Sequence, residues 1–310
     1  MAVGAAVSAG VALALQARLN GEVGARLGDG IAAGLTSSAI GMTVLLALVP
    51  TLPAGRRGLG LIRSALRTGD LRWWHCLGGV SGALFVASQG IAVGALGVAV
   101  FTVAVVGGTA AGSLGADRLG LGPSGRHPIS ATRLCGAVIC VLAVVVAVHD
   151  RLGSPGTLAL VVLPVVAGIA VAVQPALNGR VGAAAGSPWP AALVNGVVAV
   201  FSLVLALLVE LFVRGVPSGR LPTEPWLYAA GFIGIPVIAV ATLAVRYVGV
   251  LVFGLASVSG QLVGAVIIDT VTGPRPSLGT WIGTAITFAA VVIAARPPGR
   301  VRAFARTPAG

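Results

Sequence analysis

Charge is scarce in this sequence: Asp, Glu, Lys and Arg make up only 9% of its 310 residues, against about 25% in a typical soluble domain. Hydrophobic residues make up 57%, and the mean hydropathy is +1.03. So few polar side chains cannot cover a water-soluble surface. The composition therefore excludes an ordinary soluble protein and predicts a polytopic membrane protein.

Lysine is absent, so the formal net charge of +12 comes from twenty arginines. They lie between hydrophobic runs and have no accompanying aromatic-basic patch, which argues against nucleic-acid binding. We interpret them as topology determinants. With the N-terminus inside, fourteen fall in cytoplasmic segments, including a loop at 53–72 and a short Arg-rich C-terminal tail, so both termini are expected in the cytoplasm. The remaining six are Arg18, Arg26, Arg151, Arg214, Arg220 and Arg275.

Cysteine and histidine are also rare, with three residues of each. Cys76, Cys135 and Cys140 lie in or beside apolar runs without a Cys-x-x-Cys pair, which indicates free thiols. The histidines are scattered, and there is no acid-rich metal motif, catalytic constellation or nucleotide-binding loop. We therefore expect no enzyme activity, no metal and no cofactor, and ATP-driven transport would need a partner.

An internal repeat is the strongest positive signal. The stretch 16–25 returns at 174–183 with seven of ten positions identical, and 97–117 returns at 249–269 with nine of twenty-one identical. Chance alone would make roughly one position in ten identical, so the chain consists of two copies of one unit.

Ten hydrophobic runs are long enough to span about 30 Å of hydrocarbon, which takes roughly 17–25 helical residues. They lack the period-two alternation of barrel strands. We predict an all-α protein in which 73–94 with 96–116, and 226–245 with 248–269, form tight hairpins. The predicted spans are 2–20, 31–52, 73–94, 96–116, 131–149, 157–178, 189–213, 226–245, 248–269 and 279–295.

The repeat divides the chain into two units, 1–150 and 151–310, each with five predicted spans. An odd number of spans gives the two units opposite orientations in the membrane. Two inverted repeats with a site at their interface are the plan of many secondary transporters.

Amide side chains recur at matching positions of the two units. Gln16 and Asn20 are four residues apart and share a helix face, and Gln174 and Asn178 repeat this geometry. Amides at membrane depth bind a substrate or join helices by hydrogen bonds. Both interpretations remain open. If the amides join helices, the Asn-Gly pair is also expected to end each helix.

Other polar residues also occupy matching positions. Gln261, whose counterpart is Thr109, is expected to face an internal cavity. Asp117 and Asp269 end matching runs near an interface, where they pair with an arginine, bind a coupling proton or are ordinary interfacial residues. The pairs Gly108/Gly112 and Gly260/Gly264 let helices approach closely.

Several motifs together resemble the YdcZ-like family of the drug/metabolite transporter superfamily. They are Gln-x-x-Leu-Asn-Gly-x-x-Gly from Gln16, the tryptophans Trp73 and Trp74, Gly78-Gly79-x-x-Gly82, and Ser259-Gly-Gln followed by Asp269. The resemblance implies an EamA-like fold of ten helices in two inverted repeats, and export of small metabolites or drugs by alternating access. Thr109 departs from the family's Gln, and the first span lacks the mid-membrane Glu of small multidrug-resistance relatives.

The sequence thus predicts a multi-pass secondary transporter, an exporter of the cell (inner) membrane. Its partners would be a small-molecule solute, the lipid bilayer and a proton as coupling ion, with no nucleic acid. The cavity is expected between 2–20, 96–116, 157–178 and 248–269. A membrane scaffold or assembly protein without transport activity is the alternative. The expected solute contacts are Gln16, Asn20, Gln174, Asn178, Gln261 and Thr109, with Asp117 and Asp269 as coupling candidates.

Overall fold

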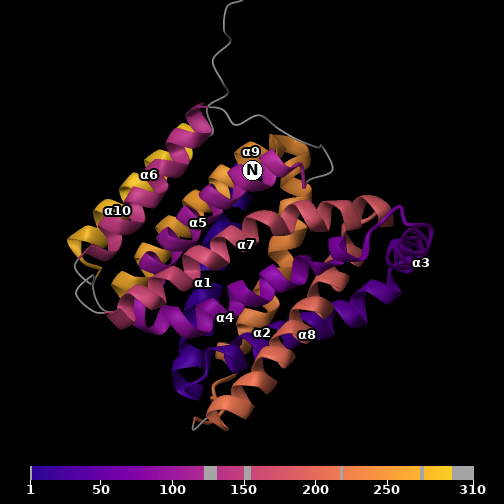
Figure 1. Ribbon diagram of the computed structural model, residues 1–310, viewed down its shortest axis with the longest axis horizontal. Helices are drawn as coiled ribbons and strands as arrows, with labels where there is room; N and C mark the ends of the chain where they lie inside the picture. Colours follow the sequence, from indigo (N-terminus) through magenta and orange to yellow (C-terminus); the bar gives the residue numbers. More distant parts are fainter. Residues whose placement is uncertain (1, 122–130, 150–154, 217–218, 273–275, 295–310) are drawn as a thin grey trace, which may run out of the picture.

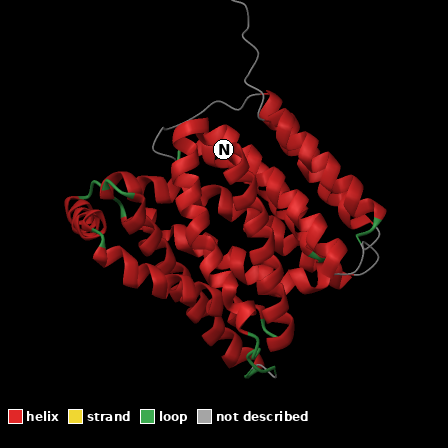
Figure 2. Cartoon of the chain, turned by 180° about the vertical axis from the view of Figure 1, so that it is seen from behind, coloured by secondary structure: helices red, strands yellow, loops and turns green. Residues whose placement is uncertain are grey.

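A computed structural model describes the backbone of residues 2–121, 131–149, 155–216, 219–272 and 276–294. The side chains of Asp117 and of 238–255 are among those outside the description. Within the described ranges the regular structure is entirely helical (Figure 2). The α-helices are α1 (Ala2–Leu27), α2 (Gly30–Leu48), α3 (Pro53–Thr68), α4 (Gly78–Leu96), α5 (Val98–Leu119), α6 (Ala131–Val148), α7 (Pro155–Ala185), α8 (Pro188–Arg214), α9 (Ala230–Thr272) and α10 (Leu278–Ala294).

Short 3-10 turns extend this framework, η1 (Val49–Thr51), η2 (Trp73–Leu77) and η4 (Pro225–Ala229). By length and composition, six helices of the described chain can cross a membrane, and four shorter stretches are also apolar. The prediction of an all-helical polytopic membrane protein is therefore confirmed. The shorter stretches are Leu134–Ala147, Pro225–Val237, Ala256–Thr272 and Leu278–Ile293.

The amide motifs lie inside helices and do not end them. α1 continues past Asn20 to Leu27, where Gly28, with φ of 67°, provides the left-handed residue that ends it. Asp29 then caps α2 by accepting hydrogen bonds from the backbone of Ile31 (2.8 Å) and Ala32 (2.9 Å). The expected helix end at Asn-Gly is wrong, because the glycines of this motif serve helix contact: a Cβ at Gly21 would clash with Val93 of α4.

The predicted spans 226–245 and 248–269 fall within η4 and a single α-helix, α9. Gln16 Nε2 donates to the carbonyl of Ala230 (3.1 Å), and Arg18 donates to that of Thr272 (3.3 Å). Both ends of α9 therefore reach the same level of α1, although 43 residues of straight helix would extend about 65 Å. The two described arms, Ala230–Val237 and Ala256–Thr272, thus form separate passes along the bundle.

The predicted loop at 53–72 contains a helix, α3, that the hydrophobic pattern did not reveal. Pro53 occupies its first turn, where a missing N–H costs nothing, and Gly69, with φ of 84°, ends it. α3 is too polar to be a span and packs on α7 and α8. Figure 1 looks along its axis, while α4 and α7 run across the same view.

Glycine brings α5 and α7 into backbone contact. A Cβ at Gly108 would overlap the carbonyl oxygen of Val165, and one at Gly112 would lie 2.8 Å from the Cα of Ile169. Gly168 of α7 is equally close to α5, at the carbonyl of Val105. Small residues allow such approach between membrane helices, so the predicted packing role of Gly108 and Gly112 is confirmed.

The second arm of α9 makes the same kind of contact with α1. Gly260 lies against the backbone of Val7, and a Cβ at Gly264 would be 3.1 Å from the Cα of Val11. Gly10 of α1 fits against the carbonyl of Ser257. In both pairs the residue numbers rise together, so each pair of helices is parallel.

We predict that Gly108→Ala destabilises the protein while Gly115→Ala, on the same helix, does not. The added methyl at Gly108 meets the α7 backbone, and overpacking of this kind costs about 1–3 kcal/mol. At Gly115 nothing lies within 4 Å, so alanine should gain up to about 1 kcal/mol of helix propensity. Thermal melting of the purified variants in detergent measures both. Equal melting temperatures would contradict the close α5–α7 contact.

Candidate functional site

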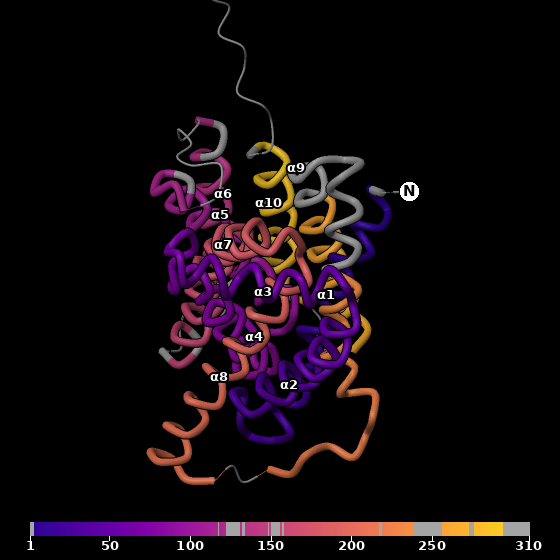
Figure 3. The backbone as a smooth tube through the Cα atoms, turned by 90° about the vertical axis from the view of Figure 1, so that its right-hand side faces the viewer, coloured from indigo at the N-terminus to yellow at the C-terminus, as the bar shows by residue number. Residues whose placement is uncertain are grey.

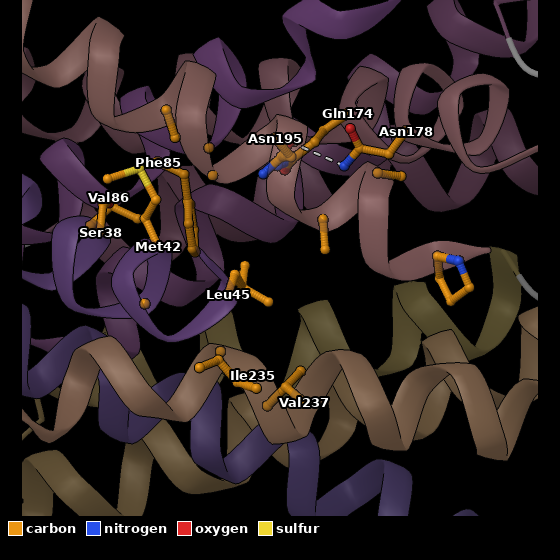
Figure 4. Close-up of a pocket in the computed structure, with 18 of the residues that line it drawn as sticks. Ser38, Met42, Leu45, Phe85, Val86, Gln174, Asn178, Asn195, Ile235 and Val237 are labelled. Atoms are coloured by element: carbon orange, nitrogen blue, oxygen red, sulfur yellow. Dashed lines mark hydrogen bonds between the residues drawn. The ribbon is translucent and has the colours of Figure 1, made fainter. Parts of the chain in front are cut away.

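A cavity of about 790 Å³ lies between α1, α2, α4, α7, α8 and the first arm of α9 (Figure 4). This volume is within the usual range of small-molecule sites, about 300–1,000 Å³. The exposed turn at Gly186 is part of the wall, so the cavity reaches the surface at the α7–α8 end of the bundle. The polar residues of its lining are Gln16, Ser37, Ser38, Gln174, Asn178, Ser187 and Asn195.

Three amides form one polar wall, which we call the amide cluster: Gln174, Asn178 and Asn195. Gln174 Nε2 and Asn178 Nδ2 both donate to Oδ1 of Asn195, at 3.0 and 3.1 Å. Figure 4 shows the three together on one side of the cavity, with Ile235 and Val237 of α9 across from them. The two donors lie one turn apart on α7, so a single acceptor on α8 serves both.

Asn195 was not among the cavity residues predicted from the sequence. Its signal was the 158-residue offset, which relates Asn195 to Ser37 of α2 and which also relates the N-cap residues Ser187 and Asp29. Both Asn195 and Ser37 line the cavity. The repeated design therefore puts a polar residue from the second span of each unit into the cavity wall, but only in one unit is it an amide.

Gln16 also lines the cavity, whereas Asn20, on the same face of α1, does not. Gln16 donates to the carbonyl of Ala230, which ties α1 to the start of α9. Asn20 is only 1% exposed and donates to Oε1 of Gln89 on α4 at 2.7 Å. Gln89 has no polar counterpart in the second unit, where position 241 is Ala. The two copies of the motif thus differ, since Asn20 is a buried helix contact and Asn178 faces the cavity.

Thr109 and Gln261 lie at the helix pairs and do not line this cavity. Thr109 Oγ1 donates to the carbonyl of Gly168 at 3.2 Å, across the α5–α7 contact. Gln261 is buried in the second arm of α9, with its backbone nitrogen beside Gly10 of α1. The cavity is lined instead by other parts of α1, α7 and α9 together with α2, α4 and α8.

Asp269 is buried and caps the N-terminus of α5. Its two carboxylate oxygens accept from the backbone N–H of Val98 (2.8 Å) and Ala99 (2.7 Å). Gly97, with φ of 82°, lets the chain turn against this carboxylate. A negative group at a helix N-terminus is stabilised by the unpaired amides and the helix dipole. The side chain of Asp117 lies outside the described residues.

The model of one protein family matches almost the whole chain, in two segments, residues 1–146 and 159–293. That family is described as "putative inner membrane exporter, YdcZ". The chain belongs to this family. No curated protein and no solved structure matches it significantly. The resemblance to the YdcZ-like family is thereby confirmed, and membership supports a multi-pass inner-membrane transporter of small molecules.

In this YdcZ family member, a layer of small and aliphatic residues packs α4 against α8 beside the cavity wall at Ala199. Ala83 and Ala87 of α4 pack against Ala199 and Leu203 of α8, and Leu203 is 1% exposed. We call these four residues the α4–α8 layer. Beside them lies a mainly apolar lateral groove of about 1,200 Å³ between α4, α8 and the α1–α2 turn. Its lining includes Phe201, 69% exposed, and the charged residues Asp29, Glu210 and Arg214.

An ion pair reinforces the end of the bundle away from the cavity mouth. Arg26 of α1 donates to Glu22 at 3.0 Å and to Glu224, just before η4, at 2.5 Å. The hydrogen bond from Arg26 holds the pKa of Glu224 below its usual value. The pair therefore persists at neutral pH and is lost when Glu224 is protonated in acid. Because both partners are largely exposed, its contribution to stability is small.

We predict that Asp269→Ala lowers the melting temperature, while Asp269→Asn has a smaller effect. Alanine leaves two buried N–H donors of α5 without an acceptor, at about 1–3 kcal/mol each, whereas asparagine keeps one acceptor oxygen. Thermal melting of the two variants, with Asp70→Ala at an exposed position as control, measures this. A variant Asp269→Asn that melts like the native protein but exports nothing would instead support proton coupling through Asp269.

Proposed function

We propose that this protein is a secondary exporter that binds a small solute at the amide cluster and moves it by alternating access. The main support is the pair of hydrogen bonds from Gln174 and Asn178 to Asn195, on the wall of a cavity that is open at one end. Amides whose donors and acceptors border a cavity can exchange these bonds for bonds to a solute. Family membership supports export as the direction.

Two inverted five-helix repeats account for the helix contacts. The offsets of 152 and 158 convert the contact of Gly108 with Val165 into that of Gly260 with Val7, and Gly112 with Ile169 into Gly264 with Val11. Each unit therefore contributes one helix to each close pair. The two segments matched by one family model, and the four shorter apolar stretches counted as spans, support the same ten-helix arrangement of units 1–150 and 151–310.

The lining favours an uncharged solute with both polar and apolar parts. None of the described residues that line the cavity is ionisable. A fully charged solute would lose hydration there without an ionic partner, which is costly. Phe85, Met42 and Leu45 supply apolar surface facing the amide cluster. We therefore expect neutral metabolites or weakly polar drugs in preference to multivalent ions.

Alternating access requires the α4–α8 layer to open while the cavity mouth closes. Ala83, Ala87 and Ala199 have small side chains, so the larger side chains of this region are Leu203 and, packed against the layer from α2, Ile31 and Leu35. The lateral groove on its far side offers an apolar exit toward the membrane. Binding energy can drive such a change only if the solute contacts differ between the two states.

The coupling ion and topology remain parts of the proposal. Asp269 already caps α5 with both oxygens, so Asp117 is the better candidate for a coupling proton. The arginine distribution supports cytoplasmic termini, which would place the cavity mouth at the α7–α8 turn on the cytoplasmic face. Gln261 and Thr109 would then act on helix pairing and affect the solute only indirectly.

The test is export by cells producing Asn178→Ala or Asn195→Ala at membrane levels equal to native. We expect loss of most export with little change in melting temperature, since water in the cavity can replace the missing amide bonds. Asn20→Ala is the matched control: it leaves buried Gln89 without its donor and should lower stability by about 1–3 kcal/mol. Released amino acids, nucleosides, sugars and cationic drugs are compared.

Unchanged release by both cavity variants would contradict solute binding at the amide cluster. If no solute in any class depends on the native protein, the alternative of a membrane scaffold or assembly protein gains support. If both cavity variants lose folded protein, the amide cluster is a packing contact and the binding proposal fails.

A further inference from the structure

Helix α3 presents a stripe of arginines away from the bundle. Gly55, Gly58 and Ile62 are buried against the protein. At 100° per residue, Arg56, Arg63 and Arg67 lie within about 40° of one another, roughly 130° around the helix from the buried face, and all are exposed. We call these three residues the arginine stripe. Arg57 is exposed as well, and α3 contains no acidic residue to offset the charge.

The position of α3 puts this stripe at the end of the bundle. The helix joins the end of span α2 to η2 and the start of span α4, and it runs across the direction of the long helices (Figure 3). Leu61 and Leu66 flank the stripe, with 45% and 39% of their surface exposed. A short helix with flanking leucines and a basic outer face is typical of segments that lie in the membrane interface.

We propose that the arginine stripe of α3 binds the phosphate groups of anionic phospholipids. The end of a membrane-spanning bundle is where lipid headgroups lie, and guanidinium groups pair with phosphate oxygens in a bidentate geometry. Clusters of basic residues beside a span are attracted to anionic lipid, by an amount equivalent to about fivefold in partitioning for each arginine. The stripe thereby anchors α3, and with it the loop between α2 and α4, to the headgroup layer.

This surface is independent of the solute site. The arginine stripe contributes nothing to the lining of the central cavity. The test therefore needs no transported solute and stays informative if the proposed function fails.

The experiment reads the environment of α3 in the full chain. Gly60 lies in the stripe with open space at its Cβ, so Gly60→Cys can carry an environment-sensitive fluorophore after Cys76, Cys135 and Cys140 are changed to Ala. The protein is placed in nanodiscs of phosphatidylcholine with increasing fractions of phosphatidylglycerol. We expect increasing protection from acrylamide quenching, with a midpoint that rises about fivefold in Arg67→Gln and no response in Arg56→Gln/Arg63→Gln/Arg67→Gln.

A matched control removes three charges at the other end of the bundle, with Arg26→Gln/Arg214→Gln/Arg220→Gln, and should respond like native. Salt of about 1 M, where the Debye length is about 3 Å, should weaken the native response. The proposal is overturned if the stripe variant responds like native, or if phosphatidylglycerol changes nothing. It is also overturned if inorganic phosphate alone gives the same protection in phosphatidylcholine, which would indicate a free-anion site.

Discussion

Backbone contact between helices at glycine is the constraint on which this structure depends. In a membrane the hydrophobic effect does not drive helices together, so close packing must supply the attraction. Gly10, Gly260 and Gly264 bring α1 against α9, and Gly108, Gly112 and Gly168 bring α5 against α7. Each contact joins the two halves of the chain, so neither half packs alone. These four helices pair tightly, and the cavity lies beside the contacts, where α1, α7 and the first arm of α9 meet α2, α4 and α8.

A second feature is the way in which the polar side chains inside the bundle are hydrogen-bonded. Two sets of amides at membrane depth have different surroundings: Asn20 bonds to Gln89, whereas Gln174 and Asn178 share Asn195. A buried amide without a partner costs free energy, so the first pair is suited to fixing helices. The second borders open space and can exchange its bonds with a solute. The same motif thus serves packing in one unit and, as proposed, recognition in the other, because its partners differ: Gln89 on α4 in the first unit and Asn195 on α8 in the second.

Composition, hydrophobic run length and the internal repeat were enough to predict an all-helical membrane protein and the helix-packing glycines, since these signals are local. Membership of the exporter family was predicted from motifs.

The extent of α1 and α7 was not predicted. Asn-Gly usually marks the end of a helix, but in this protein the glycine allows close contact with a neighbouring helix and the helix continues. α3 was not predicted because its buried face is narrow and lies in an arginine-rich segment. Thr109 and Gln261 were expected at the cavity because sequence spacing shows which residues share a helix face, but not which neighbour that face meets. The 158-residue offset relates Asn195 to Ser37, but only the contacts show that Asn195 joins Gln174 and Asn178.

The central claim is that one cavity, open at one end, holds the amide cluster behind the α4–α8 layer. Its most direct test is labelling of Ser38→Cys, on the cavity wall, by a membrane-impermeant maleimide in sealed vesicles of both orientations, in a background without native cysteines. Gly186→Cys at the cavity mouth and Leu221→Cys, 60% exposed between α8 and α9, report the two faces. The account predicts that Ser38→Cys reacts only from the face that labels Gly186→Cys. Reaction only from the face of Leu221→Cys, or equally from both, would contradict it.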